Sequence, residues 1–143
     1  MENLEETLKK YPFPFCLEIG YRIYGKKIDV TWEVKNTGEK EMHFQIGAHP
    51  AFCYPDFDAA TEERGFFGFG KKNSLKYILI SEKGCADPDT KYPLKLTDGL
   101  LPLDIHTFDK DALILENSQV RQVTLYNKEK APYLSLHFRS EEH

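Results

Sequence analysis

Long apolar runs, basic tracts and paired cysteines are all missing from this sequence. No apolar run approaches the roughly 18 residues that a membrane-spanning helix needs, so no membrane association is expected. No run of Lys and Arg exceeds two residues, and 23 acidic against 19 basic residues leave a net charge of −4. A nucleic-acid partner is therefore not expected, and a neutral polar ligand fits this charge balance better.

The cysteines are too few and too scattered for a disulfide framework or a metal site. Cys16, Cys53 and Cys85 are an odd number and form no C-x-x-C pair, so we interpret them as reduced packing residues of a cytoplasmic protein. The first ten residues, MENLEETLKK, are polar and acidic, unlike a secretory signal. No metal-binding His or Cys spacing, nucleophile elbow or phosphate-binding glycine loop is present, so we expect neither a metal nor a cofactor.

Aromatic residues, in contrast, are plentiful. Ten Phe, eight Tyr and one Trp make up 13% of the 143 residues, which favours strands over helices. This length suits one domain, and we expect residues 1–143 to form a single domain with one modest core.

Strict alternation of apolar and polar residues predicts an antiparallel meander near the N-terminus. After one possible helical turn in residues 1–10, residues 15–23 and 28–34 each place apolar side chains on one face, with Trp32 expected in the core. Gly25 supplies the turn between them. A third strand is expected over residues 42–46, with Met42, Phe44 and Ile46 facing inward.

Shorter strand candidates follow, separated by turn residues. The glycine-rich stretch 65–70 predicts an edge strand or a bend. Further candidates are residues 75–80, 94–96, 112–115, 120–126 and 133–138. Many short strands with turn signals predict an all-β antiparallel sandwich or barrel.

His49 is the main candidate for chemistry. In the predicted third strand, residue parity places Gln45 and His49 opposite the apolar face, unless a bulge at Gly47 shifts the pattern. Both side chains donate and accept hydrogen bonds, as sugar hydroxyls do, and Pro50 would stiffen the exit from the strand. A lone histidine at a strand end is, however, more often structural. His43 is interpreted as a surface or groove residue, and His106 and His137 are interpreted as ordinary surface histidines.

Two carboxylates and several aromatic rings are the other candidates. Asp109 and Asp111 precede an apolar stretch and could accept hydrogen bonds from sugar hydroxyls, although Asp is also a common turn residue. Phe52 could offer a stacking platform, as could Trp32, Tyr21 and Phe44, but packing in the core is the alternative.

Three stretches together resemble the galactose mutarotase-like superfamily, in its branch of bacterial proteins related to aldose 1-epimerase. Residues 11–52 (YPFPFCLEIGYRIYGKKIDVTWEVKNTGEKEMHFQIGAHPAF) resemble the central strands and the Gly-x-His-Pro-x-Phe signature of that family. LPLDIHTFDKDALIL and VRQVTLYNK resemble later segments. The resemblance implies a large antiparallel β-sandwich (supersandwich), here incomplete, with a hexose cleft on its concave face.

The resemblance also implies a reaction, the interconversion of the α and β anomers of an aldose by acid/base ring opening. His49 matches the acid of the family, and an imidazole with a pKa of about 6.5 suits proton transfer at neutral pH. Asp111, ahead of Asp109, matches the acceptor of the sugar hydroxyls, with Gln45 and Phe52 beside it in the cleft.

This sequence also departs from the family. The catalytic glutamate of the family has no counterpart here, because Glu141 and Glu142 belong to a polar tail, and a family arginine and second histidine are also unmatched. We therefore expect the chain to correspond to the middle of the family domain, and to form a homo-oligomer that covers exposed strand edges. The alternatives are a non-catalytic carbohydrate-binding β-sandwich module and a structural β-domain without a ligand.

Overall fold

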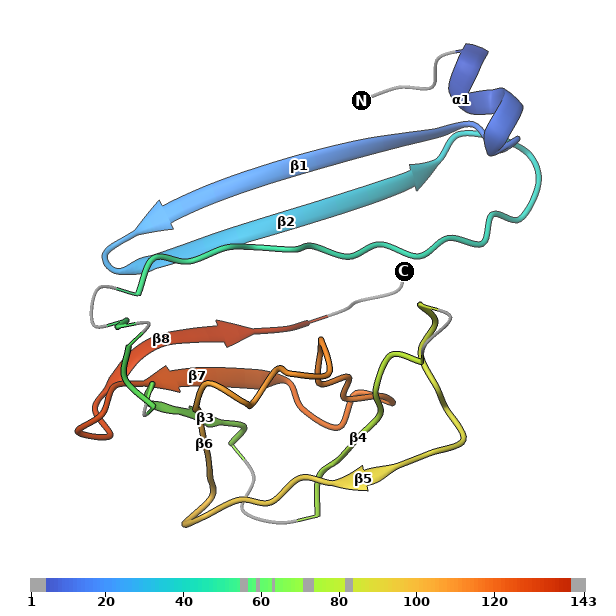
Figure 1. Cartoon of the computed structure of the whole chain (residues 1–143). Helices are drawn as coiled ribbons and strands as arrows, with labels where there is room; N and C mark the ends of the chain where they lie inside the picture. Colours follow the sequence, from blue (N-terminus) through green and yellow to red (C-terminus); the bar gives the residue numbers. More distant parts are fainter. Residues whose placement is uncertain are drawn as a thin grey trace. The chain divides into compact units, whose positions relative to one another are not determined.

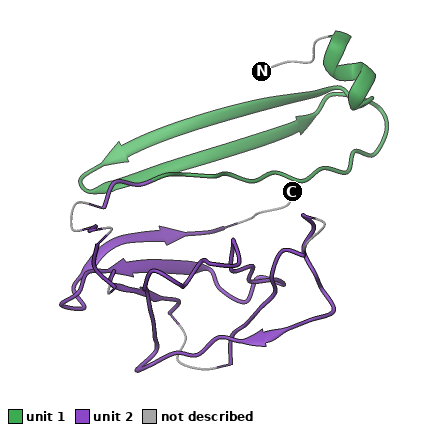
Figure 2. Ribbon diagram, in the orientation of Figure 1, with its two compact units in different colours: residues 1–51 green, residues 52–143 purple. Residues whose placement is uncertain are grey.

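The computed structural model describes residues 5–54, 57–58, 60–62, 64–70, 74–81 and 84–139. Contacts divide the chain into two compact units, unit 1 (residues 1–51) and unit 2 (residues 52–143), coloured separately in Figure 2. The boundary falls within the Gly47 to Phe52 signature. That the whole chain acts as a single domain stays a prediction.

Unit 1 consists of a short helix and a long hairpin (Figure 1). Helix α1 (Glu5–Lys10) has acidic residues in its first turn and basic residues in its last, which complements the helix dipole. The strands β1 (Phe15–Tyr24) and β2 (Lys27–Asn36) pair antiparallel in an unbroken register. Gly25 has a φ of 58°, which explains why glycine occupies the turn. The predicted helical turn and first hairpin are thus confirmed.

The apolar side chains of the hairpin share one face, as the alternation predicts. Directly opposed residues of an antiparallel pair project to the same side. The apolar face, as we call it below, is made by the opposed pairs Leu17↔Val34, Ile19↔Trp32, Tyr21↔Val30 and Ile23↔Ile28.

The expectation that this apolar face lies in a core is wrong for most of its residues. Ile19 is 47% exposed, Ile23 is 74% exposed, and Trp32, expected in the core, is 40% exposed. No described residue of unit 1 is buried, because the two strands have no second layer of unit 1 packed on them. The opposite face is polar, with Lys35 Nζ 3.3 Å from a Glu18 carboxylate oxygen.

The predicted third strand is also wrong. Residues 37–51 form no hydrogen-bonded strand, and Phe44 and Ile46 are each 49% exposed. The segment is tied down by isolated bonds instead. The Asn36 side-chain amide donates to the Lys40 carbonyl (2.8 Å), and the Tyr11 hydroxyl donates to the His43 carbonyl (2.6 Å). Alternation marks a segment able to form a strand, but a strand also needs a backbone partner.

Unit 2 is built from short strands in two antiparallel sheets (Figure 1). The larger sheet has the order β6-β3-β7-β8, and β4 pairs with β5 in the smaller one. Their bounds are β3 (Phe66–Gly68), β4 (Lys76–Tyr77), β5 (Tyr92–Pro93), β6 (Leu100–Pro102), β7 (Gln122–Tyr126) and β8 (Pro132–His137). The antiparallel all-β architecture expected from the sequence is confirmed.

Strand β3 lies inside its sheet, between β6 and β7, so its assignment as an edge or a bend is wrong. Glycine permits this position. Gly65 has a φ of 93°, and a Cβ there would collide with the Tyr126 carbonyl oxygen of β7. A Cβ on Gly68 would lie 2.7 Å from the Tyr126 ring. The glycines that suggested a bend are the residues that let two neighbours approach β3 closely.

Replacing Gly65 by alanine is expected to destabilise the protein by about 2–5 kcal/mol. The left-handed backbone costs an L-residue about 1–2 kcal/mol, and the clash with the Tyr126 carbonyl adds an overpacking cost of about 1–3 kcal/mol. Gly70 is the matched control, because its φ is 65° and nothing lies within 4 Å of its Cβ position. Urea denaturation of both alanine variants measures the difference. Equal losses of stability would show that the close approach to Tyr126 is unimportant.

The core of unit 2 is small. Phe69, Leu75 and Leu94 form a buried cluster, and partly buried side chains such as Phe67 and Val123 pack around it. Thr124 of β7 is the buried polar residue of the described part, and its hydroxyl lies 2.8 Å from that of Ser135. That bond satisfies a group that would otherwise be costly to bury.

The later strand candidates are shorter than expected. The expected strand at 75–80 contracts to β4 plus isolated bridges at Ile78 and Ile80, and 112–115 supplies one bridge, from Ile114 to Ile78. The candidate at 94–96 is wrong, because β5 comes two residues earlier. The candidates at 120–126 and 133–138 correspond to β7 and β8, each within one or two residues at its ends.

Candidate functional site

His49 and Gln45 lie in unit 1, on the extended segment that follows β2. Both side chains are exposed, and neither makes a hydrogen bond or ion pair within the described residues. His43, on the same segment, lies 3.9 Å from a Glu41 carboxylate oxygen. An exposed imidazole followed by a proline is available to a ligand that forms hydrogen bonds, which is the condition that the predicted role of His49 requires.

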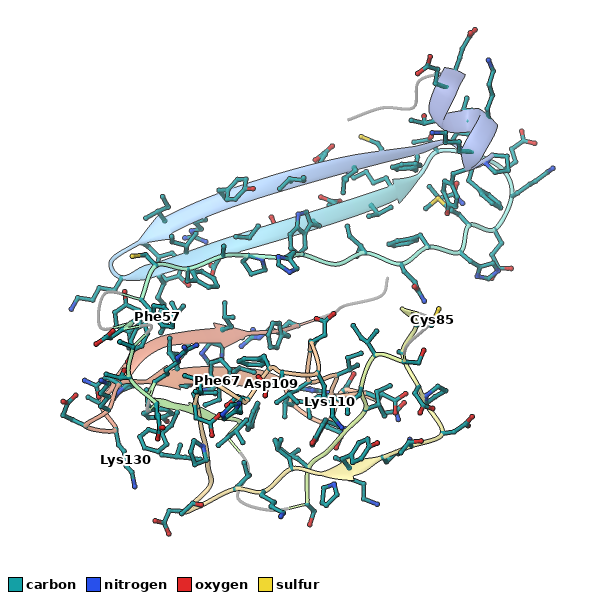
Figure 3. All side chains as sticks on the ribbon, viewed as in Figure 1. Phe57, Phe67, Cys85, Asp109, Lys110 and Lys130 are labelled. Atoms are coloured by element: carbon teal, nitrogen blue, oxygen red, sulfur yellow. The ribbon has the colours of Figure 1, made fainter. Side chains whose placement is uncertain are left out.

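Asp109 and Asp111 lie in unit 2, in and directly after a turn over residues 105–110. Figure 3 labels Asp109 and Lys110 of this turn. The Asp111 amide donates to the Phe108 carbonyl (3.0 Å), and its φ of 69° is a left-handed conformation that Asp tolerates better than most residues. The Asp111 carboxylate is exposed and has no partner among the described residues, so it can accept hydrogen bonds from a ligand.

Asp109 is not isolated, because its carboxylate oxygen lies 2.8 Å from Nδ1 of His106. The turn itself is closed by Asp104, which accepts from the His106 amide (2.8 Å) and from the Thr107 hydroxyl (3.0 Å). The interpretation of His106 as a surface histidine agrees with its exposure, but its pairing with Asp109 is not predicted from the sequence. The His-x-x-Asp spacing is the sequence signal for this pair, but it brings the two side chains into contact only where the chain turns.

Hydrogen bonding and charge shift the titration of two groups in this turn. The Asp109 carboxylate, by hydrogen bonding and then by its charge, raises the pKa of His106 above its ordinary value of about 6.5. Hydrogen bonds from the His106 amide and the Thr107 hydroxyl lower the pKa of Asp104. The arrangement therefore favours an imidazolium held by a carboxylate.

Substituting Asp109 by asparagine is expected to lower the pKa of His106 toward 6.5, because the largest stabilising interaction of the imidazolium is removed. The pair stabilises the fold fully below the unfolded pKa of histidine, and this contribution is lost as the pH rises through the raised folded pKa. NMR titration of the His106 ring protons measures the shift. Asp111→Asn is the matched control and should leave the titration unchanged. A His106 pKa that is the same in Asp109→Asn and in the unsubstituted protein would contradict the pairing.

The predicted site residues divide between the two units. Gln45 and His49 belong to unit 1, and Phe52, Asp109 and Asp111 belong to unit 2. Phe52 is 49% exposed, so a packed core position is not its role, and a stacking role stays a prediction. The assignment of these five residues to one sugar site likewise stays a prediction.

The remaining expectations concern cysteines, metals and membranes. The three cysteines are free, but Cys53 and Cys85 are exposed and so are not packing residues. Among the described residues, no group of His, Cys, Asp and Glu is arranged to hold a metal ion. Nor does any helix of the described part combine the length and apolar character that crossing a membrane requires.

Comparison with known proteins decides the family. The family model described as aldose 1-epimerase matches residues 1–136. The chain belongs to the aldose 1-epimerase family. The proteins named LacX, plasmid, and LacX, chromosomal, both from Lactococcus lactis subsp. lactis, are each 31% identical to it over 135 residues. Each match covers 93% of this chain and 45% of the relative, so the chain spans less than half the length of these curated relatives.

A solved structure supports the same assignment within the aldose 1-epimerase family. The galactose mutarotase related enzyme from Lactobacillus acidophilus matches with a TM-score of 0.76 and 26% sequence identity. The match covers 90% of this chain and 43% of that protein. The short antiparallel strands described above are therefore part of a galactose mutarotase-like fold, as the resemblance of the sequence implied.

Proposed function

We propose that this chain is a carbohydrate-binding protein of the aldose 1-epimerase type, which interconverts the anomers of a hexose by acid/base ring opening. The observation that carries the proposal is the family match over residues 1–136, which includes the Gly47 to Phe52 signature. The exposed and unpaired imidazole of His49 supports it, because a proton donor must be free to reach the ring oxygen of the sugar.

In the proposed mechanism His49 protonates the ring oxygen while a base removes the proton of the anomeric hydroxyl. The C–O bond of the ring breaks and the aldehyde carbon rotates. On closure the attacking hydroxyl returns its proton to His49, and the base returns its proton to the aldehyde oxygen. The exposed carboxylate of Asp111, and that of Asp109 beside it, would accept hydrogen bonds from the other hydroxyls and fix the orientation of the sugar. Gln45 and Phe52 would complete the contacts.

The second candidate is a carbohydrate-binding module without catalysis. It rests on the exposed side chains of Gln45, His49 and Asp111, which have no hydrogen-bond partner among the described residues and could bind sugar hydroxyls without transferring a proton. Polarimetry with freshly dissolved α-glucose and α-galactose separates the two functions. The enzyme accelerates the approach to the anomeric equilibrium, whereas the module leaves the spontaneous rate unchanged and still shows saturable sugar binding by NMR titration. A protein that does neither would overturn both.

We also propose that two copies of the chain associate through unit 1. The apolar face of the hairpin is exposed, and the outer edges of both β1 and β2 lack a strand partner within the described residues. Monomeric proteins rarely leave a contiguous apolar patch of this kind in water. A second copy offers the same patch, which a two-fold axis can bring into contact with the first.

A further inference from the structure

A polar pocket of about 250 Å³ lies in unit 2 beside β4, and none of the candidate sugar-site residues lines it. Strand β4 and the neighbouring β5 can be followed in Figure 1. One side of the pocket is formed by Lys76, Tyr77 and Ile78. Lys91 directly precedes β5, and the turn after Ile114 supplies Glu116, Asn117 and Gln119. Its volume is below the roughly 300–1,000 Å³ usual for drug-sized ligands, so it suits a smaller molecule.

The pocket is held open by backbone-directed hydrogen bonds. The Gln119 carboxamide takes the place of a strand partner, since its oxygen accepts from the Lys76 amide (3.0 Å) and its nitrogen donates to the Lys76 carbonyl (2.8 Å). Two residues further on, Ile78 and Ile114 exchange backbone hydrogen bonds of 2.9 and 3.1 Å. The turn is therefore pinned to β4 at both ends, so a ligand would meet a site that is already formed.

The strand pair beside the pocket is also braced by aromatic stacking. Tyr77 stacks on Tyr92 across the two strands, with ring centroids 5.5 Å apart and an interplanar angle of 29°. Tyr77 is among the residues that line the pocket and Tyr92 is not. The stack therefore braces the pairing of β4 with β5 beside the charged groups.

The charges in the pocket leave one cation in excess. Lys91 Nζ lies 3.1 Å from a Glu116 carboxylate oxygen, and the two side chains are 45% and 27% exposed. The Lys76 ammonium makes no ion pair within the described residues, although it lines the same pocket. Two lysines against one glutamate give the pocket a net charge of +1, and the Asn117 carboxamide adds hydrogen-bond donors.

We propose that this pocket binds a small organic oxyanion, a phosphate monoester or a carboxylate of monosaccharide size or smaller. Lys76 would contact the anion directly and Asn117 would donate to it, whereas Lys91 would contribute less because Glu116 already neutralises it. A divalent metal is a poorer match, because only one carboxylate is present and it is already paired with Lys91. The proposal does not depend on His49 or on the anomer-converting activity.

The test is an NMR titration that follows the side-chain amides of Asn117 and Gln119. The probes are inorganic phosphate, acetate, glucose 6-phosphate and glucose at constant ionic strength. Saturable shifts with the anions, and none with glucose, are expected. Comparison of phosphate with acetate tells which oxyanion is preferred. Loss of the Lys76 charge in Lys76→Gln should weaken anion binding by at least about fivefold, since two unit charges about 4 Å apart attract by about 1 kcal/mol even in water.

Two further variants test whether the effect on anion binding depends on the position and the sign of the charge removed. Lys95→Gln removes the same charge from an exposed residue that does not line the pocket, so it should leave binding nearly unchanged. Glu116→Gln should strengthen anion binding by a few-fold, because Lys91 is released from its ion pair and a repulsive carboxylate is removed. If the ligand were instead a neutral sugar, Glu116→Gln would remove a carboxylate acceptor from the pocket and weaken binding. Equal effects of Lys76→Gln and Lys95→Gln, weaker anion binding in Glu116→Gln, or no saturable shift with any anion would overturn the proposal.

Discussion

Replacing His49 by alanine is expected to lower the catalysed rate of anomer interconversion by about 10²–10⁴-fold, the usual contribution of a positioned acid or base. The loss should appear in kcat more than in KM, because proton transfer to the ring oxygen occurs in the transition state, whereas the sugar is held by other groups. Folding should be nearly unaffected, since the His49 side chain is exposed and has no partner within the described residues. Polarimetry measures the rate, and a thermal unfolding curve checks the fold.

His43 gives the matched control for this experiment. It is the same residue type on the same extended segment, and its side chain is 85% exposed. His43→Ala leaves in place the backbone carbonyl that accepts from the Tyr11 hydroxyl, so the segment stays anchored. The His43 variant should retain the activity that the His49 variant loses. Equal activity in both variants would remove His49 from the mechanism and leave sugar binding as the function to test.

Local patterns predicted the hairpin of unit 1 well. Its two strands are adjacent in sequence, their alternation sets which side chains share a face, and Gly25 sets the turn, so the register from Phe15 to Asn36 follows from the sequence alone. What alternation cannot provide is the layer that covers the apolar face. The same limit applies to residues 42–46, where the pattern is right for a strand but no partner backbone is bonded to it.

Strands β3 and β6 of unit 2 are harder to predict than the adjacent pair β7 and β8, because the partners of β3 are distant in sequence. Phe66 of β3 pairs with Pro102 on one side and with Tyr126 on the other. Nothing local in the sequence indicates these pairings, and the short strands that result are too brief to show a period. Gly65 and Gly68 indicate an unusual backbone, but only the structure shows that Tyr126 of β7 approaches both of them closely.

The residues of the candidate site also differ in how far the sequence predicts them. His49 and Asp111 could be nominated from the sequence, because a signature and a turn preceding an apolar stretch are linear features. The contact of His106 with Asp109 depends on the conformation of a turn. In the polar pocket the Gln119 side-chain amide bonds to the backbone of Lys76, 43 positions away in sequence, as a neighbouring strand would. No spacing rule describes such a contact, so the pocket could be found only from the structure.

Substituting Ile19 by lysine is expected to weaken self-association by about 10–100-fold. Ile19 lies on the apolar face of the hairpin, opposite Trp32, and is 47% exposed. Burying a large aliphatic side chain contributes about 1.5–3 kcal/mol, and the substitution loses that contribution and also places a charge in the contact. Sedimentation equilibrium over a range of concentrations measures the change in dissociation constant.

Thr31→Lys is the matched control. Thr31 precedes Trp32 in β2 and faces the polar side of the same hairpin, so the substitution adds the same charge outside the apolar face. If the apolar face is the contact, the Thr31 variant associates like the unsubstituted chain while the Ile19 variant becomes monomeric. If association instead proceeds only through the unpaired strand edges, the two variants behave alike, because neither alters the backbone hydrogen-bonding groups of β1 or β2. A monomer at every concentration, before any substitution, would contradict both routes.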